Sequence, residues 1–357
     1  MQRVHSILTS RVAALLLAFL LLAALDVSAQ ATSPGGALQA PRRKVVDEMG
    51  RAVRIPSSPS RIVSLAPSLT ETIYALGLQD RLVGDTDFCD YPVEAQKKRK
   101  VGGIINPNLE EIASLHPDLV LLTKSINRLD TVRALDTLGI PSYATSDPHS
   151  VAQIISSTEK LADVLGASEA GKSLGEELQG RLAVLQMKLA AFPPRRVLFI
   201  VWTEPLISTG QNTFIADVLR KAGAVSIVKS SQDWPQMSLE AVVHLQPDYL
   251  VFASSHSESA ARDFDALAVR PGWRILDAVR NRHYAIISDA VNRPAPRIIS
   301  AIEDLARQLH PEAFQNLPEP NKEPAPANSE PSLPPRSAIS SFSFTICACS
   351  TESLCAL

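Results

Sequence analysis

The chain carries a near-repeat at a constant offset of 130 residues, and this repeat constrains the fold more than any other feature. Residues 108–121 read NLEEIASLHPDLVL, and residues 238–251 read SLEAVVHLQPDYLV. Each copy predicts a capped helix, a Pro-Asp turn and a buried strand. Two copies indicate two lobes of similar build, and the cleft between such lobes is a natural place for a small ligand.

Strand and helix patterns alternate around each copy. The strongest strand pattern covers residues 61–66, and an apolar stripe predicts a helix directly after it. Ser68 and Glu71 have capping-box spacing at the start of this helix, and Gly77 marks its end. A weak alternation over residues 44–55 predicts an initial hairpin. This order of elements predicts parallel sheets with helices on their faces.

The stretch between the two copies predicts one long helix. Its leucines keep a one-sided register, and they are Leu174, Leu178, Leu182, Leu185 and Leu189. Gly171, Gly175 and Gly180 each cost such a helix up to about 1 kcal/mol relative to alanine. We therefore expect that packing holds the helix, which Pro193 and Pro194 end.

These patterns predict an α/β fold of two Rossmann-like lobes joined by a single long α-helix. The expected segments are a signal peptide at 1–29, an N-terminal segment at 30–60, an N-terminal lobe at 61–165, the bridging helix at 166–193, a C-terminal lobe at 194–314 and a Pro-rich, disordered tail at 315–357.

The N-terminus has the pattern of an export signal. Arg3 and Arg11 precede an aliphatic run over residues 12–25, and small residues at 27–29 offer a cleavage site. The run is shorter than the ~20 residues that span a membrane, although an uncleaved anchor is the alternative. No cysteine follows the run to carry a lipid. The mature protein is therefore expected outside the cytoplasm.

Composition and motifs exclude several classes of function. A net charge of −2 gives no general attraction to nucleic acid. The seven histidines form no ligand pair at helical spacing, and Cys89 is the only cysteine in the body of the chain, so no metal site is predicted. The sequence contains no P-loop, G-x-S-x-G or G-x-G-x-x-G motif. We expect no catalysis, and an exported α/β enzyme is the alternative from another class.

Each copy of the repeat places a glutamate at the second helical position, Glu110 in one and Glu240 in the other. The structural interpretation is that acids favour the first turn of a helix, where Glu111 also has capping-box spacing to Asn108. The functional interpretation is that these matching acids, one on each lobe, dock onto basic sockets of a partner. The residues alone leave both interpretations open.

The chain resembles the periplasmic substrate-binding proteins of ABC importers for cobalamin and iron–siderophores, and it is most similar to their cobalamin-binding member. The resemblance covers roughly residues 61–309 and rests on these motifs: SLAPSLTE at 64–71, DYP at 90–92, NLE at 108–110, PDLV at 117–120, WPQMSLE at 234–240 and PRII at 296–299. It implies a class III periplasmic binding protein, in which a rigid helix bridges two lobes. It also implies that Glu110 and Glu240 pair with arginines of the permease.

The resemblance implies that a ligand lies between the lobes. The ligand-binding residues that it suggests are Tyr91, Trp202, Trp234, Asp289, Asn292 and Arg293. Ile104 and Thr123 stand where the family's cobalamin binder has tryptophans, and Trp202 is a candidate replacement for part of that aromatic wall. A strand-end core position is the other interpretation of Trp202.

The resulting expectation is a monomeric periplasmic protein that hands cobalamin or a related corrinoid to an ABC permease. It needs no cofactor of its own, because the metal chelate is its cargo. A ferric siderophore or haem is the alternative ligand, and extra arginines in the cleft, such as Arg293, favour that anionic class.

Overall fold

The structure, a computed structural model, describes residues 41–125, 127–253 and 257–315. The predicted signal peptide and the part of the predicted tail beyond Gln315 lie outside these residues. No helix among the described residues is both long and apolar enough to cross a membrane. An antiparallel hairpin of β1 (Arg42–Val46) and β2 (Ala52–Pro56) opens the described chain and confirms the predicted one.

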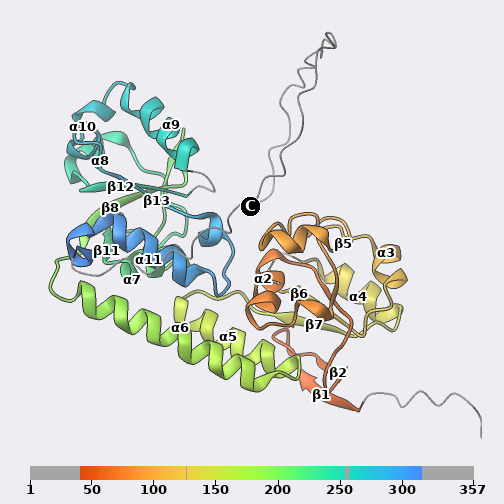
Figure 1. The fold of residues 1–357 in the computed structure, drawn as a ribbon. Coiled ribbons are helices and arrows are strands. Elements are labelled where there is room, and N and C mark those ends of the chain that lie inside the picture. Colours follow the sequence, from red (N-terminus) through yellow and green to blue (C-terminus); the bar gives the residue numbers. More distant parts are fainter. Residues whose placement is uncertain (1–40, 126, 254–256, 316–357) are drawn as a thin grey trace, which may run out of the picture. The chain divides into compact units, whose positions relative to one another are not determined.

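The N-terminal lobe is built on a parallel five-stranded sheet with the order β5-β4-β3-β6-β7 (Figure 1). Its strands are β3 (Ile62–Ser64), β4 (Leu82–Asp85), β5 (Arg99–Lys100), β6 (Leu119–Thr123) and β7 (Ser142–Thr145). Its helices are α2 (Pro67–Ala75), α3 (Leu109–Ser114), α4 (Leu129–Thr137) and α5 (Val151–Val164), with short 3-10 helices η2 (Gln79–Arg81) and η3 (Val93–Lys97).

Both faces of this sheet are covered. Leu119 and Leu121 of β6 pack with α2 and α5 on one face, while Val120 and Leu122 pack with α3 and α4 on the other. Successive side chains of a strand point to opposite faces, so burial on both faces requires a continuous apolar run. This is why β6 has the sequence LVLLT.

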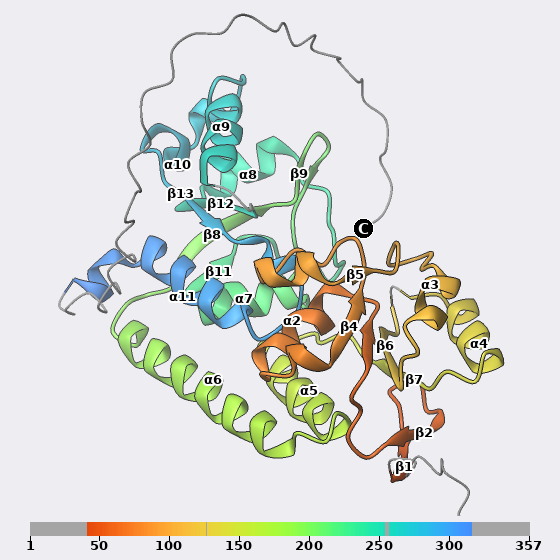
Figure 2. The same ribbon diagram turned by 45° about the vertical axis from the view of Figure 1, so that its right-hand side comes forward.

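The C-terminal lobe repeats this plan with four parallel strands in the order β11-β8-β12-β13 (Figure 2). The strands are β8 (Arg195–Ile200), β11 (Ala224–Ser226), β12 (Tyr249–Ala253) and β13 (Tyr284–Ile287), and a small ribbon pairs β9 (Trp202–Thr203) with β10 (Leu206–Ile207). The helices are α7 (Phe214–Lys221), α8 (Leu239–Leu245), α9 (Ser257–Ala268), α10 (Asp277–Arg280) and α11 (Ile298–Leu309), with η4 (Trp273–Ile275), η5 (Asp289–Asn292) and η6 (Pro311–Phe314).

The repeat forms the same unit in both lobes, as predicted. The first copy is α3 followed by β6, and the second is α8 followed by β12. Asn108 Oδ1 accepts a hydrogen bond from the Glu111 N–H at 3.0 Å, and Ser238 Oγ accepts one from the Ala241 N–H at 3.2 Å. Both residues are therefore N-caps.

The Pro-Asp turns of the two copies also match in detail. The residues just before the prolines, His116 and Gln246, both have positive φ, at 46° and 41°. The Asp118 carboxylate accepts from the Arg61 N–H at 3.1 Å, and the Asp248 carboxylate accepts from the Arg196 N–H at 2.7 Å. In each lobe, the aspartate thereby ties the repeat to the first strand of the sheet.

The long helix α6 (Ser168–Leu189) confirms the predicted bridge and packs along α5. A 22-residue helix is about 33 Å long at 1.5 Å per residue. Two of its predicted weak points allow this packing. A Cβ added at Gly171 would lie 2.4 Å from Ala162 Cβ, and one at Gly175 would lie 2.1 Å from Glu159 Oε1. Glycine thus lets α5 and α6 approach closely, and the pair forms a stiffer connection than one helix would.

The predicted start of α2 is wrong. Ala66 is the N-cap and makes no side-chain capping bond, and Pro67 occupies the first turn. Proline is favoured at the first helical position because its φ is already helical and its missing N–H is not needed there. Ser68 therefore lies inside the helix, and the strand before it is only Ile62–Ser64. The Glu71 side chain is free to contact a residue far along the chain.

Candidate ligand-binding site

The predicted ligand residues follow carboxyl ends of parallel strands. Tyr91 lies in the loop after β4, Trp202 begins β9 directly after β8, and Asp289 to Arg293 follow β13. Trp234 lies in the segment between β11 and α8. Ligand sites of open parallel α/β sheets lie at this edge. Most of the predicted residues therefore lie in segments that leave this edge of a sheet.

A buried ion pair connects the N-terminal lobe to the segment before α11. Arg297 donates to both carboxylate oxygens of Glu71, at 2.9 Å from Nε and 2.9 Å from Nη2. Its Nη1 donates to Asp289 Oδ1 at 3.0 Å. The Glu71 side chain is only 2% exposed and that of Arg297 only 16%. Two parallel bonds between a guanidinium and a carboxylate fix orientation as well as charge.

A second ion pair links the same segments at the surface. Arg293 Nη1 contacts Asp90 Oδ1, and its Nη2 donates to Asp90 Oδ2 at 3.1 Å. Arg293 Nη1 also lies 3.6 Å from Glu71 Oε1 and 3.8 Å from Asp289 Oδ2. The Asp90 side chain is 54% exposed. The Asp90 end of this pair is therefore open to solvent, whereas the Glu71–Arg297 pair is buried.

The electrostatics follow from burial and pairing. The hydrogen bond from Arg293 lowers the pKa of the Asp90 carboxyl. Burial raises the pKa of Glu71, and Arg297 opposes that rise. Burial alone would lower the pKa of Arg297, but its bonds to Glu71 and Asp289 raise it overall. The cluster contains three carboxyl groups and two guanidinium groups, so its acidic groups outnumber its basic ones.

Three of the predicted aromatic residues have exposed rings, and the ring of Tyr91 contacts this cluster. Tyr91 is 46% exposed, and Arg297 Cζ lies 4.1 Å from the centre of its ring. Trp202 and Trp234 are each 51% exposed. Large aromatic side chains are usually buried, so half-exposed ones suit contact with a ligand. The core interpretation of Trp202 is therefore wrong.

The other three predicted ligand residues, Asp289, Asn292 and Arg293, differ in their contacts. Asp289 bridges to Arg297, and Arg293 pairs with Asp90. Asn292 is exposed at the end of η5, and no hydrogen bond of its side chain occurs within the described part of the chain. Nothing in its surroundings assigns Asn292 a role.

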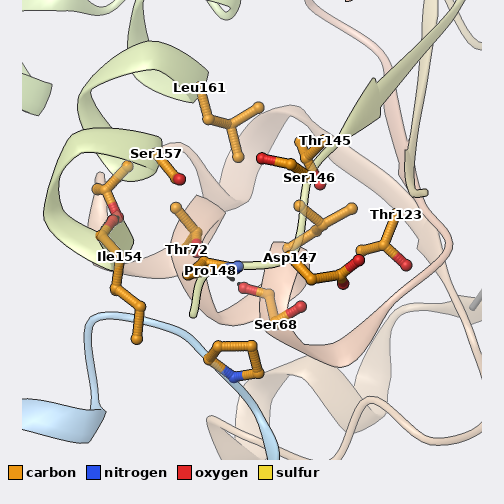
Figure 3. Close-up of a pocket in the computed structure, with 13 residues that line it drawn as sticks. Ser68, Thr72, Thr123, Thr145, Ser146, Asp147, Pro148, Ile154, Ser157 and Leu161 are labelled. Carbon is orange, nitrogen blue, oxygen red and sulfur yellow. Dashed lines mark hydrogen bonds between the residues drawn. The ribbon is translucent and has the colours of Figure 1, made fainter. Parts of the chain in front are cut away.

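A small polar pocket lies at the carboxyl edge of the N-terminal sheet (Figure 3). Its volume is about 30 Å³, and hydroxyl side chains such as Ser68, Thr72, Thr123 and Ser157 line it, together with Pro294. A pocket of this size holds a water molecule but no macrocycle. Thr123 is buried here with its N–H donating to Asn127 Oδ1 at 2.7 Å, so it is no part of an exposed wall.

A larger hollow of about 610 Å³ adjoins this pocket. Ser146, Asp147, Pro148 and Ser157 line both. Lys124 contributes a cation to the larger hollow, whose volume is in the range typical of ligand pockets. None of the six predicted ligand residues lines either space.

Glu110 and Glu240 occupy equivalent exposed positions in α3 and α8. No ion pair among the described residues involves either of them. The neighbouring Glu111 does not complete the predicted capping box, because its side chain pairs with Arg99 at 2.6 Å. A backbone hydrogen bond and the Ser238 hydroxyl lower the pKa of Glu240, which is therefore charged at neutral pH.

Sequence reasoning missed three residues of this site. Glu71 was interpreted as a capping residue, and Arg297 only as part of a family motif. Phe88 is 57% exposed in the loop that carries Tyr91. It follows β4 after Thr86 and Asp87, and an apolar residue there gives no sequence signal that separates a site residue from a core residue. In the described ranges, no cluster of three or more His, Cys, Asp or Glu side chains is suited to hold a metal ion.

Residues 62–290 match the family model described as periplasmic binding protein. The chain is 33% identical over 276 residues to the uncharacterized ABC transporter substrate-binding lipoprotein YvrC of Bacillus subtilis, covering 75% of this chain and 86% of that one. It is 32% identical to the vitamin B12-binding protein of Photorhabdus laumondii, covering 71% and 89%.

A solved structure agrees with these matches. The haem-binding protein RhuT of Roseiflexus sp. RS-1, in its apo form, superposes with a TM-score of 0.61 and 27% identity, covering 71% of this chain and 99% of that one. Membership of one family accounts for the two parallel α/β lobes, the duplicated unit and the bridging helix. The chain belongs to the periplasmic binding protein family, in the class whose lobes are joined by one long helix.

Proposed function

We propose that this protein is the solute-binding component of an ABC importer, and that it captures cobalamin or a related corrinoid between its lobes. The function is binding and delivery, without bond chemistry. The choice of ligand rests on the ion pairs that Arg293 and Arg297 already make. Asp90, Glu71 and Asp289 already neutralise Arg293 and Arg297, so the cluster does not attract an anionic chelate.

A corrinoid suits this cluster chemically. Its ring is flat and edged with amide groups, each of which both donates and accepts hydrogen bonds. Amides can accept from Arg293 and donate to Asp90 or Asp289 without a change in net charge. The exposed rings of Phe88, Trp202 and Trp234 offer apolar contact to a flat macrocycle. The relative named vitamin B12-binding protein supports the same proposal.

Calorimetry tests this choice of ligand. The mature protein should bind cyanocobalamin at micromolar concentration or tighter, and a shift of the visible absorption band should accompany the heat. Haemin should bind more weakly under the same conditions. Absence of both heat and band shift with cyanocobalamin, together with tight binding of haemin, would overturn the assignment.

A haem or ferric-siderophore carrier is the second candidate, and Tyr91 favours it. Its ring is half-exposed, beside Arg297, and a tyrosine oxygen is a known axial ligand of haem iron. The similarity to the haem-binding protein RhuT supports this candidate as well. Tyr91→Phe separates the two candidates, because it removes the oxygen but keeps the ring. It should abolish an iron–phenolate absorption band if haem is the ligand and leave cyanocobalamin binding nearly unchanged otherwise.

We also propose that Glu110 and Glu240 dock onto the permease. They are matched, exposed acids on equivalent helices, one in each lobe. A macrodipole interaction accounts for an acid at either site but gives no reason for both to remain without an ion pair. The stiff α5–α6 connection permits only modest lobe motion, so the permease would separate the lobes through these contacts.

Charge reversal tests the docking proposal. Glu110→Lys with Glu240→Lys should abolish transport in cells while ligand affinity in vitro stays unchanged. Glu176→Lys is the matched control, since Glu176 is also an exposed helical acid but lies on α6. Normal transport by the double variant would leave both glutamates as helix-end residues.

Export through residues 1–29, with cleavage before Gln30, completes the proposal. We expect a monomer in the periplasm. N-terminal sequencing of the protein recovered from the periplasmic fraction checks the cleavage, and an intact Met1 in a membrane fraction would identify an anchor instead.

A further inference from the structure

The loop after β4, residues 86–98, carries side chains of two kinds. Phe88, Asp90 and Tyr91 point outward and are exposed, and they belong to the candidate site. Cys89 and Ala95 point inward and are buried. The inner side chains therefore determine how the outer ones are presented. We call residues 86–98 the β4 loop.

The ammonium group of Lys100 is hydrogen-bonded to the inner side of the β4 loop. Lys100 Nζ lies 2.8 Å from Asp85 Oδ1, 3.0 Å from the Cys89 carbonyl oxygen and 3.2 Å from the Ala95 carbonyl oxygen. An ammonium has three N–H donors, so this arrangement uses all of them. The two carbonyls lie on either side of Asp90 and Tyr91. Lys100 is thus hydrogen-bonded to the loop on both sides of Asp90 and Tyr91.

The thiol of Cys89 adds a second inward contact. Cys89 Sγ lies 3.3 Å from Thr70 Oγ1 and 3.2 Å from Thr86 Oγ1. Thr70 also donates to Ser64 Oγ at 2.8 Å. These neutral contacts tether Cys89 alone. They do not reach Ala95, whose carbonyl oxygen accepts from Lys100, while Lys98 Nζ ties the end of the loop to the Gln79 carbonyl oxygen.

Asp85 is the counter-ion that keeps Lys100 in place. Its side chain is fully buried, and its Oδ2 has no hydrogen-bond partner among the described residues. Burial raises the pKa of Asp85 to about 6, opposed by Lys100 and Lys98 and assisted by Asp87. From α2, Tyr74 also faces this carboxylate, and burial together with Asp85 raises its pKa.

Burying a carboxylate with one oxygen unpaired lowers the stability of the folded state, so the presence of Asp85 at this position needs an explanation. We propose that Lys100, fixed by Asp85, is a positioning residue that holds the β4 loop in the shape that presents Phe88, Asp90 and Tyr91 to the ligand. The inference rests on the proposed function for the ligand, but the loop geometry itself is measurable without any ligand.

The proposal predicts opposite responses of loop and protein to acid. Because the pKa of folded Asp85 lies above its ordinary value, the contribution of Asp85 itself to the free energy of unfolding rises as pH falls through about 6. The same proton removes the counter-charge of Lys100 and loosens its hold on the two carbonyls. A purely structural ion pair would not loosen one loop while the fold gains stability.

Hydrogen exchange of the ligand-free mature protein tests this. The amides of Cys89, Ala95 and Lys98 are hydrogen-bonded within the β4 loop and report on it. After correction for intrinsic rates, their protection should fall about tenfold between pH 7.5 and 5.5. Asp85→Asn should show low protection at both pH values, and Lys100→Met likewise. Peptides covering β12 serve as the internal reference.

Lys97→Met is the matched control, because Lys97 is an exposed lysine of the same loop, and the described contacts to Asp85 and to the Cys89 and Ala95 carbonyls come from Lys100 instead. It should keep the wild-type response. Unchanged protection in Lys100→Met, or a wild-type pH response in Asp85→Asn, would overturn the proposal. If Lys100→Met fails to fold, wild type against Asp85→Asn still decides. Failure to bind cobalamin would refute the proposed function but not this result.

Discussion

Two ion pairs join the same two segments of the molecule, yet their surroundings give them different properties. Glu71–Arg297 is bidentate and buried, and Arg297 is held further by Asp289. Asp90–Arg293 lies at the surface, with Asp90 more than half exposed. A buried pair leaves an uncompensated charge when one partner is lost, whereas an exposed pair is readily replaced by water or ligand. The comparison indicates a fixed contact beside an exchangeable one.

The largest expected effect comes from breaking the buried pair. Arg297→Met leaves the Glu71 carboxylate without its partner and should lower the free energy of unfolding by about 3 kcal/mol. Asp90→Asn, the change at the exposed partner of the second pair, should cost less than about 1 kcal/mol, because Asp90 is 54% exposed. Urea denaturation at pH 7.5 measures both. Equal losses of unfolding free energy in the two variants would show that the buried and the exposed ion pair do not differ in strength.

The pH dependence of the Arg297→Met variant sharpens the same comparison. Burial raises the pKa of Glu71, and Arg297 opposes that rise, so removing Arg297 lets the pKa rise further. A carboxyl with a raised folded-state pKa stabilises the protein below its unfolded pKa and loses that contribution as pH rises. The deficit of the variant should therefore be smaller at pH 5 than at pH 7.5. A deficit independent of pH would show that Glu71 does not carry the cost.

The exchangeable pair should control ligand charge selectivity. Asp90→Asn frees Arg293, so the affinity for haemin, an anionic probe, should rise about tenfold, equivalent to about 1.4 kcal/mol. Cyanocobalamin affinity should change less. Asp87→Asn is the control, because Asp87 is an exposed carboxylate in the same loop. Calorimetry with both probes gives the four affinities. A similar gain in haemin affinity for Asp87→Asn would show that the effect comes from the loss of any negative charge in the loop and not from the Asp90–Arg293 pair.

The smallest effect is expected at the ring beside the buried pair. Tyr91→Ala removes the contact between the ring and Arg297 and should cost about 0.5–1 kcal/mol of unfolding free energy. Tyr91→Phe keeps the ring and should be neutral within measurement. Thermal denaturation of both variants compares them, and a loss in Tyr91→Phe would assign the effect to the hydroxyl instead.

The fold was largely predictable because its determinants are local and repeated. The 130-residue offset predicted two lobes, and the leucine register predicted α6. Gly171 and Gly175, which looked like weak points in α6, lie against α5, and the pattern of one helix cannot reveal such a contact. The capping box at Ser68 and Glu71 failed because Pro67 determines where α2 begins.

The site was less predictable, because its main contacts are not local. Glu71 and Arg297 are separated by 226 residues, and no spacing rule connects them. Resemblance suggested Tyr91, Asp289 and Arg293, which the structure brings into one cluster, but it did not show that carboxylates pair with the arginines. Phe88 was missed, since an apolar residue after a strand has the same sequence pattern whether it faces core or solvent.

A crystal structure of the mature protein with cyanocobalamin tests the central claim most directly. The account predicts that both Glu71–Arg297 hydrogen bonds remain, while Arg293 has turned from Asp90 to an amide of the ligand. A broken Glu71–Arg297 pair, or a ligand bound with Asp90–Arg293 intact and untouched, would contradict it.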